Sequence, residues 1–136
     1  MPSWEDVRTY LRDRYQLRRF EPTQVELAWT FPDSQEPQRQ TIEIRRAMDR
    51  PIIVVYCDTG QNAFNDREAL QHNMTLGVGA LAIADGEYVL RHVVLLEELH
   101  WATLDKALEM LAHEAARLKR LRRGTQDITC LMNYAE

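Results

Sequence analysis

Residues 77–123, GVGALAIADGEYVLRHVVLLEELHWATLDKALEMLAHEAARLKRLRR, decide the fold of this chain. Two apolar segments flank Asp85-Gly86, a dipeptide that favours the tight turn of a β-hairpin because both residues tolerate a positive φ. A long helix follows, because apolar residues recur there every three or four positions: Leu104, Leu108, Leu111, Ala112, Ala115 and Leu118. The rest of the chain must supply an apolar surface for this helical face.

Cap signals predict two shorter helices. Ser3 is followed three residues later by Asp6, a capping-box pattern that predicts a helix over residues 4–14. Asn65 and Glu68 give the same spacing for a brief second helix, whose packed face is expected to be Ala69, Leu70 and Met74. The long third helix is expected to stop at Gly124, since glycine is the usual residue just beyond a helix end.

Strands are predicted between the first two helices. Apolar and polar residues alternate over residues 25–31 and 40–48, which is typical of half-buried strands. Residues 51–57 are almost continuously apolar and predict a central strand covered on both faces. Residues 15–20 are a further candidate for a short strand.

These elements predict an α+β fold in which helices pack on an antiparallel sheet, in the order α-β-β-β-α-β-β-α. The pairing is expected to be antiparallel because the connections between strands are too short for crossover helices. A chain of 136 residues suits a single domain, which we assign to residues 1–123. Residues 124–136 are expected to form a C-terminal tail with a small apolar group at residues 128–132.

Composition favours an ordinary globular protein of the cytoplasm. The chain is 45% hydrophobic and 28% charged, with a net charge of −4 and two cysteines, so no disulfide framework is expected. The N-terminus has no apolar segment typical of a secretory signal, and no apolar run is long enough for a membrane span. The acidic net charge argues against a nucleic-acid partner, and the basic residues at 117–123 suit the C-terminal end of a helix or an acidic docking partner.

Motifs of enzyme chemistry are weak. Asp58-Thr59-Gly60 follows an apolar strand, as the aspartate of aspartic proteases does, so a homodimeric hydrolase that uses Asp58 is an alternative hypothesis. Gly77-x-Gly79 precedes a strand rather than a helix, which is the wrong context for a dinucleotide. The histidines, His72, His92, His100 and His113, have no metal-ligand spacing. We therefore expect no catalytic residue, no cofactor and no metal.

The order of elements resembles the class I type III secretion chaperones and the wider chaperone-like superfamily of bacterial proteins, which includes sensory-transduction regulators. The likeness is strongest over residues 66–121, where the short helix DREALQHNMTL, the hairpin GALAIADGEYVLRHVVLLEEL and the helix after HWATLD follow one another. Trp4 in the first helix extends it to about residues 3–123. The resemblance implies a homodimer that shares its second helix or final hairpin, and that binds protein segments by apolar patches and strand addition without catalysis.

The leading hypothesis is therefore a non-enzymatic protein-binding module, a chaperone or regulatory adaptor that holds a segment of a partner protein. Apolar strand residues are the candidate partner-binding groups: Trp29, Phe31, Ile42 and Ile44. A third hypothesis is a structural subunit of a larger assembly that docks through residues 128–132. The sequence does not identify the partner.

Overall fold

A computed structural model describes the backbone of residues 2–32, 36–60 and 65–135, and the side chains of these segments as far as residue 120. Helices α1, α2 and α3 span Trp4–Arg14, Asp66–Asn73 and Trp101–Ala135, and a 3₁₀ turn spans Leu96–Glu98. The strands are β1 (Leu17–Phe20), β2 (Gln24–Trp29), β3 (Gln38–Ala47), β4 (Arg50–Asp58), β5 (Ala80–Ala84) and β6 (Glu87–Leu95). The predicted α+β class is confirmed.

The sheet has six strands in the spatial order β1-β2-β3-β4-β6-β5, and all its pairs are antiparallel. Four strands, not three, precede α2, so the element order is α-β-β-β-β-α-β-β-α. The extra element is β1, the short candidate strand at residues 15–20. It was hard to predict because its burial is slight and a bulge between Leu17 and Arg19 interrupts its pairing with β2.

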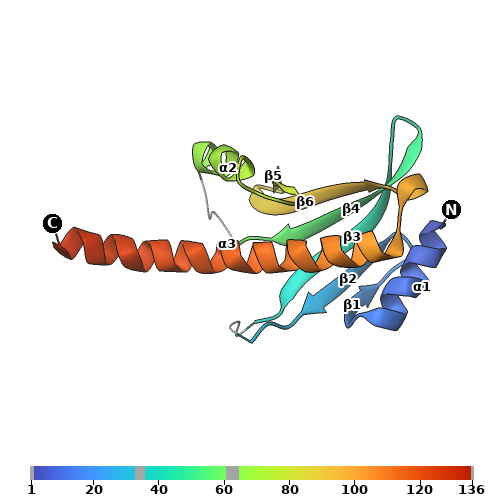
Figure 1. The fold of residues 1–136 in the computed structure, drawn as a ribbon, viewed down its shortest axis with the longest axis horizontal. Coiled ribbons are helices and arrows are strands. Elements are labelled where there is room, and N and C mark those ends of the chain that lie inside the picture. Colours follow the sequence, from blue (N-terminus) through green and yellow to red (C-terminus); the bar gives the residue numbers. More distant parts are fainter. Residues whose placement is uncertain (1, 33–35, 61–64, 136) are drawn as a thin grey trace.

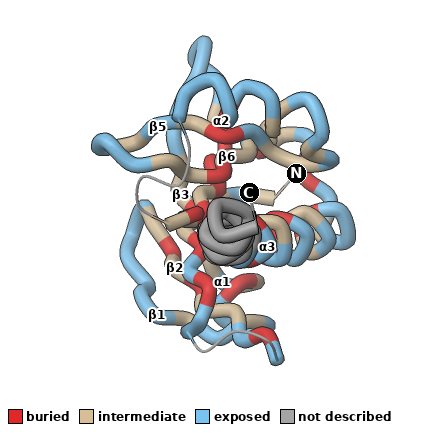
Figure 2. The backbone as a smooth tube through the Cα atoms, turned by 90° about the vertical axis from the view of Figure 1, so that its left-hand side faces the viewer, coloured by how far each residue is buried: buried red, intermediate tan, exposed pale blue. Residues whose placement is uncertain are grey.

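Helices α1 and α3 lie on one face of the sheet, which curves around α3, while α2 lies beside β5 at one end (Figures 1 and 2). The six predicted stripe residues of α3 are all buried, and Leu108 and Leu111 are fully so. Four of them, Leu104, Leu108, Leu111 and Ala115, share one core cluster with inner residues of the sheet that include Ile42, Ile53 and Val55. Burial of such a leucine contributes about 1.5–3 kcal/mol, so this contact supplies much of the stability of the fold.

The predicted central position of the strand at residues 51–57 is confirmed, but the described helices cover only one of its two faces. β4 lies between β3 and β6, and it is buried continuously from Ile52 to Val55. Ile53 and Val55 face α3, whereas Val54 is fully buried on the opposite face although that face carries no helix among the described residues. Neighbouring strands shield Val54, whose register partners are Glu43 and Val93. The sheet is therefore tightly packed in its middle and more open towards both edges.

Cap and turn predictions hold at three places. The side chain of Ser3 accepts from the Asp6 N–H in a complete capping box, and Asn65 accepts from the Glu68 N–H. Asp85 and Gly86 have φ values of 52° and 80°, as the predicted hairpin turn requires. The prediction that α3 stops at Gly124 is wrong, because the helix continues to Ala135 (Figure 1). A single glycine inside a helix costs about 1 kcal/mol, which a long helix tolerates.

Candidate functional site

The four predicted partner-binding residues lie on the helix-covered side of the sheet, where they contribute to the core: Trp29 in β2, Phe31 just after it, and Ile42 and Ile44 in β3. Ile42 is completely buried, and Phe31 is 9% exposed against Ala112 and Ala116 of α3. Trp29 and Ile44 are half-buried, and both pack against the main core. In this structure Ile42 and Phe31 have little surface to offer a partner.

Trp29 takes part in a buried polar network that fixes α3 to the sheet. Its indole N–H donates to Gln40 Oε1 at 2.9 Å, and Gln40 is fully buried. Gln40 Nε2 donates to the Leu108 carbonyl at 2.9 Å and to Cys57 Sγ at 3.3 Å. Burial raises the pKa of the Cys57 thiol to about 12, so the sulfur is a neutral acceptor here. The Gln40 amide thus uses its hydrogen bonds to join β2, β3, β4 and α3, so we interpret the network as structural.

Asp58 ends β4 and is held by structural contacts. Its carboxylate lies 2.7 Å from Lys119 Nζ and accepts from Gln38 Nε2 at 3.0 Å. The next residue, Thr59, is buried and donates to the Tyr88 carbonyl at 2.9 Å. A pair of aspartates that shares a proton needs carboxylates free of such a cation. Nothing among the described residues adds support to the hydrolase hypothesis.

Among the described residues, no three His, Cys, Asp or Glu side chains gather closely enough to hold a metal ion. His92 lies half-buried on β6, where burial lowers its pKa. His113 lies on α3 with its ring 4.2 Å from that of Phe31 and its Nε2 3.9 Å from Glu109. Neither histidine belongs to a metal-binding group among the described residues.

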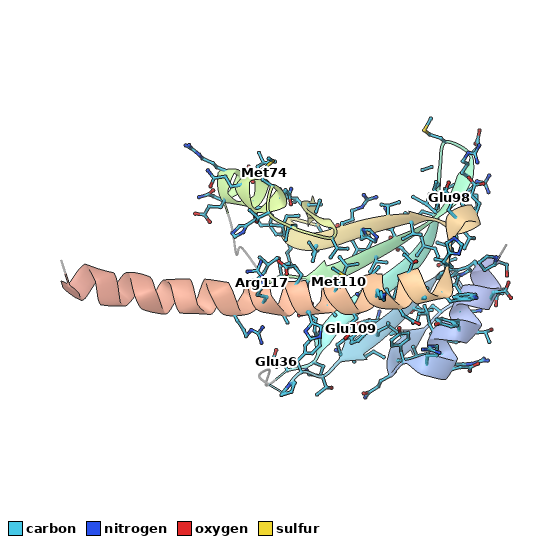
Figure 3. The ribbon with its side chains drawn as sticks, in the orientation of Figure 1. Glu36, Met74, Glu98, Glu109, Met110 and Arg117 are labelled. Atoms are coloured by element: carbon cyan, nitrogen blue, oxygen red, sulfur yellow. The ribbon has the colours of Figure 1, made fainter. Side chains whose placement is uncertain are left out.

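The basic segment at residues 117–123 lies within α3 and not at its C-terminal end, as was predicted, because the helix continues to Ala135. Neighbouring acids partly neutralise this segment. Arg117 is paired with Glu114 one turn earlier, and hydrogen bonds to this carboxylate raise the pKa of Arg117 (Figure 3). Lys119 is paired with Asp58. The side chains of Arg122 and Arg123 lie outside the described residues, as does the apolar group at residues 128–132. Docking through either feature stays a prediction.

Large exposed apolar side chains gather instead around α2 and β5. Leu70 of α2 is 68% exposed, and Ile83 of β5 is 61% exposed. Met74, the C-cap of α2, is 87% exposed (Figure 3). Ile83 lies opposite Tyr88, whose hydroxyl donates to Asp66 in the first turn of α2, so Ile83 faces the α2 side of the hairpin. We call Leu70, Met74 and Ile83 the α2–β5 surface. Clustered exposed side chains of this size are typical of protein-interaction sites.

The predicted packing of α2 is wrong at two of its three positions. Ala69 is buried against Leu81 and Leu118, but Leu70 and Met74 point to solvent. The row that faces the hairpin consists of Ala69 and Asn73, four residues apart. A small alanine lets the helix approach the hairpin closely, and the larger leucine is left on the adjacent row.

Both edges of the sheet show protection against strand pairing. β1 is only four residues long, contains the bulge at Leu17 and Arg19, and carries charged Arg18 as well. Short, bulged and charged edge strands resist pairing with other chains. β5 is different, because its sequence Ala-Leu-Ala-Ile-Ala is uncharged. Its outer edge is met at Leu81 by the side chain of Asn73.

No family model, curated protein or solved structure matches this chain. None of the helices in the part of the chain that the structure describes has an apolar stretch long enough to cross a membrane. What is established is an α+β fold of three helices and a six-stranded antiparallel open sheet, with an exposed apolar surface at one end.

Proposed function

We propose that the protein is a non-enzymatic protein-binding module of the secretion-chaperone-like class, a chaperone or regulatory adaptor that works as a homodimer. The observation that carries this proposal is the α2–β5 surface, where Leu70, Met74 and Ile83 are all more than half exposed beside an uncharged edge strand. Binding a protein would remove these side chains from water and could add a strand to the outer edge of β5.

The element order supports membership of this class. A first helix, a set of antiparallel strands, a short second helix, a hairpin and a long last helix follow one another as the resemblance implies. The short second helix and the final hairpin, which are expected to be shared in a dimer, are also the two elements at which the α2–β5 surface lies.

The sequence of β5 favours a second copy as the first partner. Ala80-Leu81-Ala82-Ile83-Ala84 is nearly symmetric about Ala82, so two antiparallel copies would place each Leu81 opposite an Ile83. Symmetric dimers require such a self-complementary surface. Leu81 and Ile83 also share one backbone orientation, since alternate residues of a strand direct their N–H and C=O groups to the same side. The pairing would join two six-stranded sheets into one.

Affinity capture with matched variants tests the protein-binding role. The wild-type chain, Ile83→Lys and Met48→Lys are each immobilised and exposed to native lysate, and retained proteins are compared by mass spectrometry. Met48 is the control because it is 96% exposed and lies in the β3–β4 turn, away from the α2–β5 surface. We expect one or two stoichiometric proteins with wild type and Met48→Lys that are lost with Ile83→Lys. An identical set with all three chains would refute a role for this surface.

A further inference from the structure

The side chain of Asn73 makes two hydrogen bonds with the backbone of a single residue in β5. Its Oδ1 accepts from the Leu81 N–H at 2.6 Å, and its Nδ2 donates to the Leu81 carbonyl at 3.3 Å. In an antiparallel pair, the residue of a neighbouring strand would make the same two bonds with Leu81. The Asn73 amide therefore occupies the place of a partner's peptide group.

The opposite edge of β5 confirms this geometry. Leu81 lies across from Leu90 of β6, and Ala82 from Val89, on a hairpin closed by a two-residue turn. In such a hairpin the backbone groups alternate, so those of Ala82 point to β6 and those of Leu81 and Ile83 point outward. Asn73 thus closes one of two adjacent outward positions, and the other lies at Ile83, whose side chain is 61% exposed.

Helix α2 has few attachments that would keep Asn73 in place. The helix has eight residues, and Ala69 is its one buried residue. Besides Asn73, Asp66 fixes it to the hairpin by accepting from the Tyr88 hydroxyl. Helices of this length have little stability of their own, so their position depends on such contacts. A binding partner can therefore displace the Asn73 amide without unfolding the sheet.

We propose that Asn73 is an intramolecular competitor of a partner strand, which keeps the β5 edge closed until α2 moves. This inference rests on the proposed pairing of two copies through β5. A second copy pairs with Leu81 only after the Asn73 amide has left, so Asn73 weakens the dimer. Only partners whose own contacts outweigh the loss of the two Asn73 hydrogen bonds can then bind this edge. Removal of the Asn73 amide strengthens the pairing.

Two measurements on the full-length chain test this proposal. Hydrogen exchange of the Leu81 amide, at a concentration where the chain is monomeric, reports directly on the bond to Asn73 Oδ1. Sedimentation equilibrium reports on dimer formation. The variant is Asn73→Ala, and the matched control is Gln71→Ala, an exposed residue of the same helix. A further variant, Asn73→Asp, keeps an acceptor for the Leu81 N–H and guards against a folding defect of the alanine variant.

We expect Asn73→Ala to accelerate Leu81 exchange about 10-fold or more and to tighten the dimer about 10-fold, since two hydrogen bonds are lost from the competing state. Asn73→Asp should retain most of the Leu81 protection, and Gln71→Ala should match wild type. Unchanged Leu81 protection in Asn73→Ala, or a dimer that is no tighter than that of wild type, would overturn the competitor role. Faster Leu81 exchange with no dimer in any chain would instead refute the proposed pairing and leave Asn73 as a closing group only.

Discussion

Replacement of Gln40 by methionine tests how α3 is fixed to the sheet. Gln40 is 0% exposed, and its amide makes three hydrogen bonds, to Trp29, Leu108 and Cys57. Methionine has a similar length but no amide, so all three bonds are lost while most of the packing remains. At about 0.5–1.5 kcal/mol for each bond, less the gain from burying an apolar group, we expect a loss of about 2 kcal/mol. The expected fall in Tm is about 4–8 °C.

Urea unfolding followed by circular dichroism measures this loss, with Gln71→Met as the exposed control. A double-mutant cycle with Trp29→Phe isolates the bond at 2.9 Å between the indole N–H and Gln40 Oε1. We expect a coupling energy of about 1 kcal/mol, because phenylalanine leaves no N–H without an acceptor. A Gln40→Met variant within about 0.5 kcal/mol of wild type, with no coupling to Trp29, would refute the reasoning, since such a change is typical of an ordinary surface substitution.

Three further predictions concern backbone space and buried titratable groups. Gly79→Ala should lower the free energy of unfolding, measured in urea, by about 2 kcal/mol or more. Gly79 has φ +72°, and a Cβ there would lie 2.8 Å from a Leu111 side-chain atom. The control Gly77→Ala should be nearly neutral, because a Cβ at Gly77 would meet no atom within 4 Å. Cys57 should resist iodoacetamide at pH 8 in the native state, as peptide mapping would show, because burial raises its pKa to about 12. Burial, and secondly the hydrogen bond to Asp105, raise the pKa of the Tyr15 hydroxyl in the folded chain. As pH rises above about 10, the hydroxyl ionises first in the unfolded chain, so the free energy of unfolding should fall. Asp105→Asn should make that fall smaller.

Most of the fold could be predicted because its signals are local. The α3 stripe, the Ser3 and Asn65 caps and the Asp85-Gly86 turn each depend on a few neighbouring residues. The sequence signal of β1 was weaker. Its Phe20 packs under the guanidinium of Arg8 in α1, which lies 4.2 Å from the centroid of the Phe20 ring. Such tertiary contacts leave no periodic pattern in the sequence.

The candidate site was harder to predict than the core. Trp29, Phe31, Ile42 and Ile44 alternate as core residues do, and alternation does not tell which face of a sheet a helix will cover. The surface around Leu70 became visible only when α2 was placed against the hairpin through Ala69. The role of Asn73 had no sequence signal, because it depends on hydrogen bonds to the backbone of Leu81, eight residues further along the chain.

Self-association is the most direct test of the central claim that the α2–β5 surface binds protein. Sedimentation equilibrium compares wild type with Ile83→Lys, which places a charge on an uncharged edge strand at a position that is 61% exposed and therefore tolerant of substitution. Met48→Lys adds the same charge to a different exposed site. The account predicts a concentration-dependent dimer for wild type and Met48→Lys and a monomer for Ile83→Lys. A wild-type chain that stays monomeric, or an Ile83→Lys variant that associates as wild type does, would contradict it.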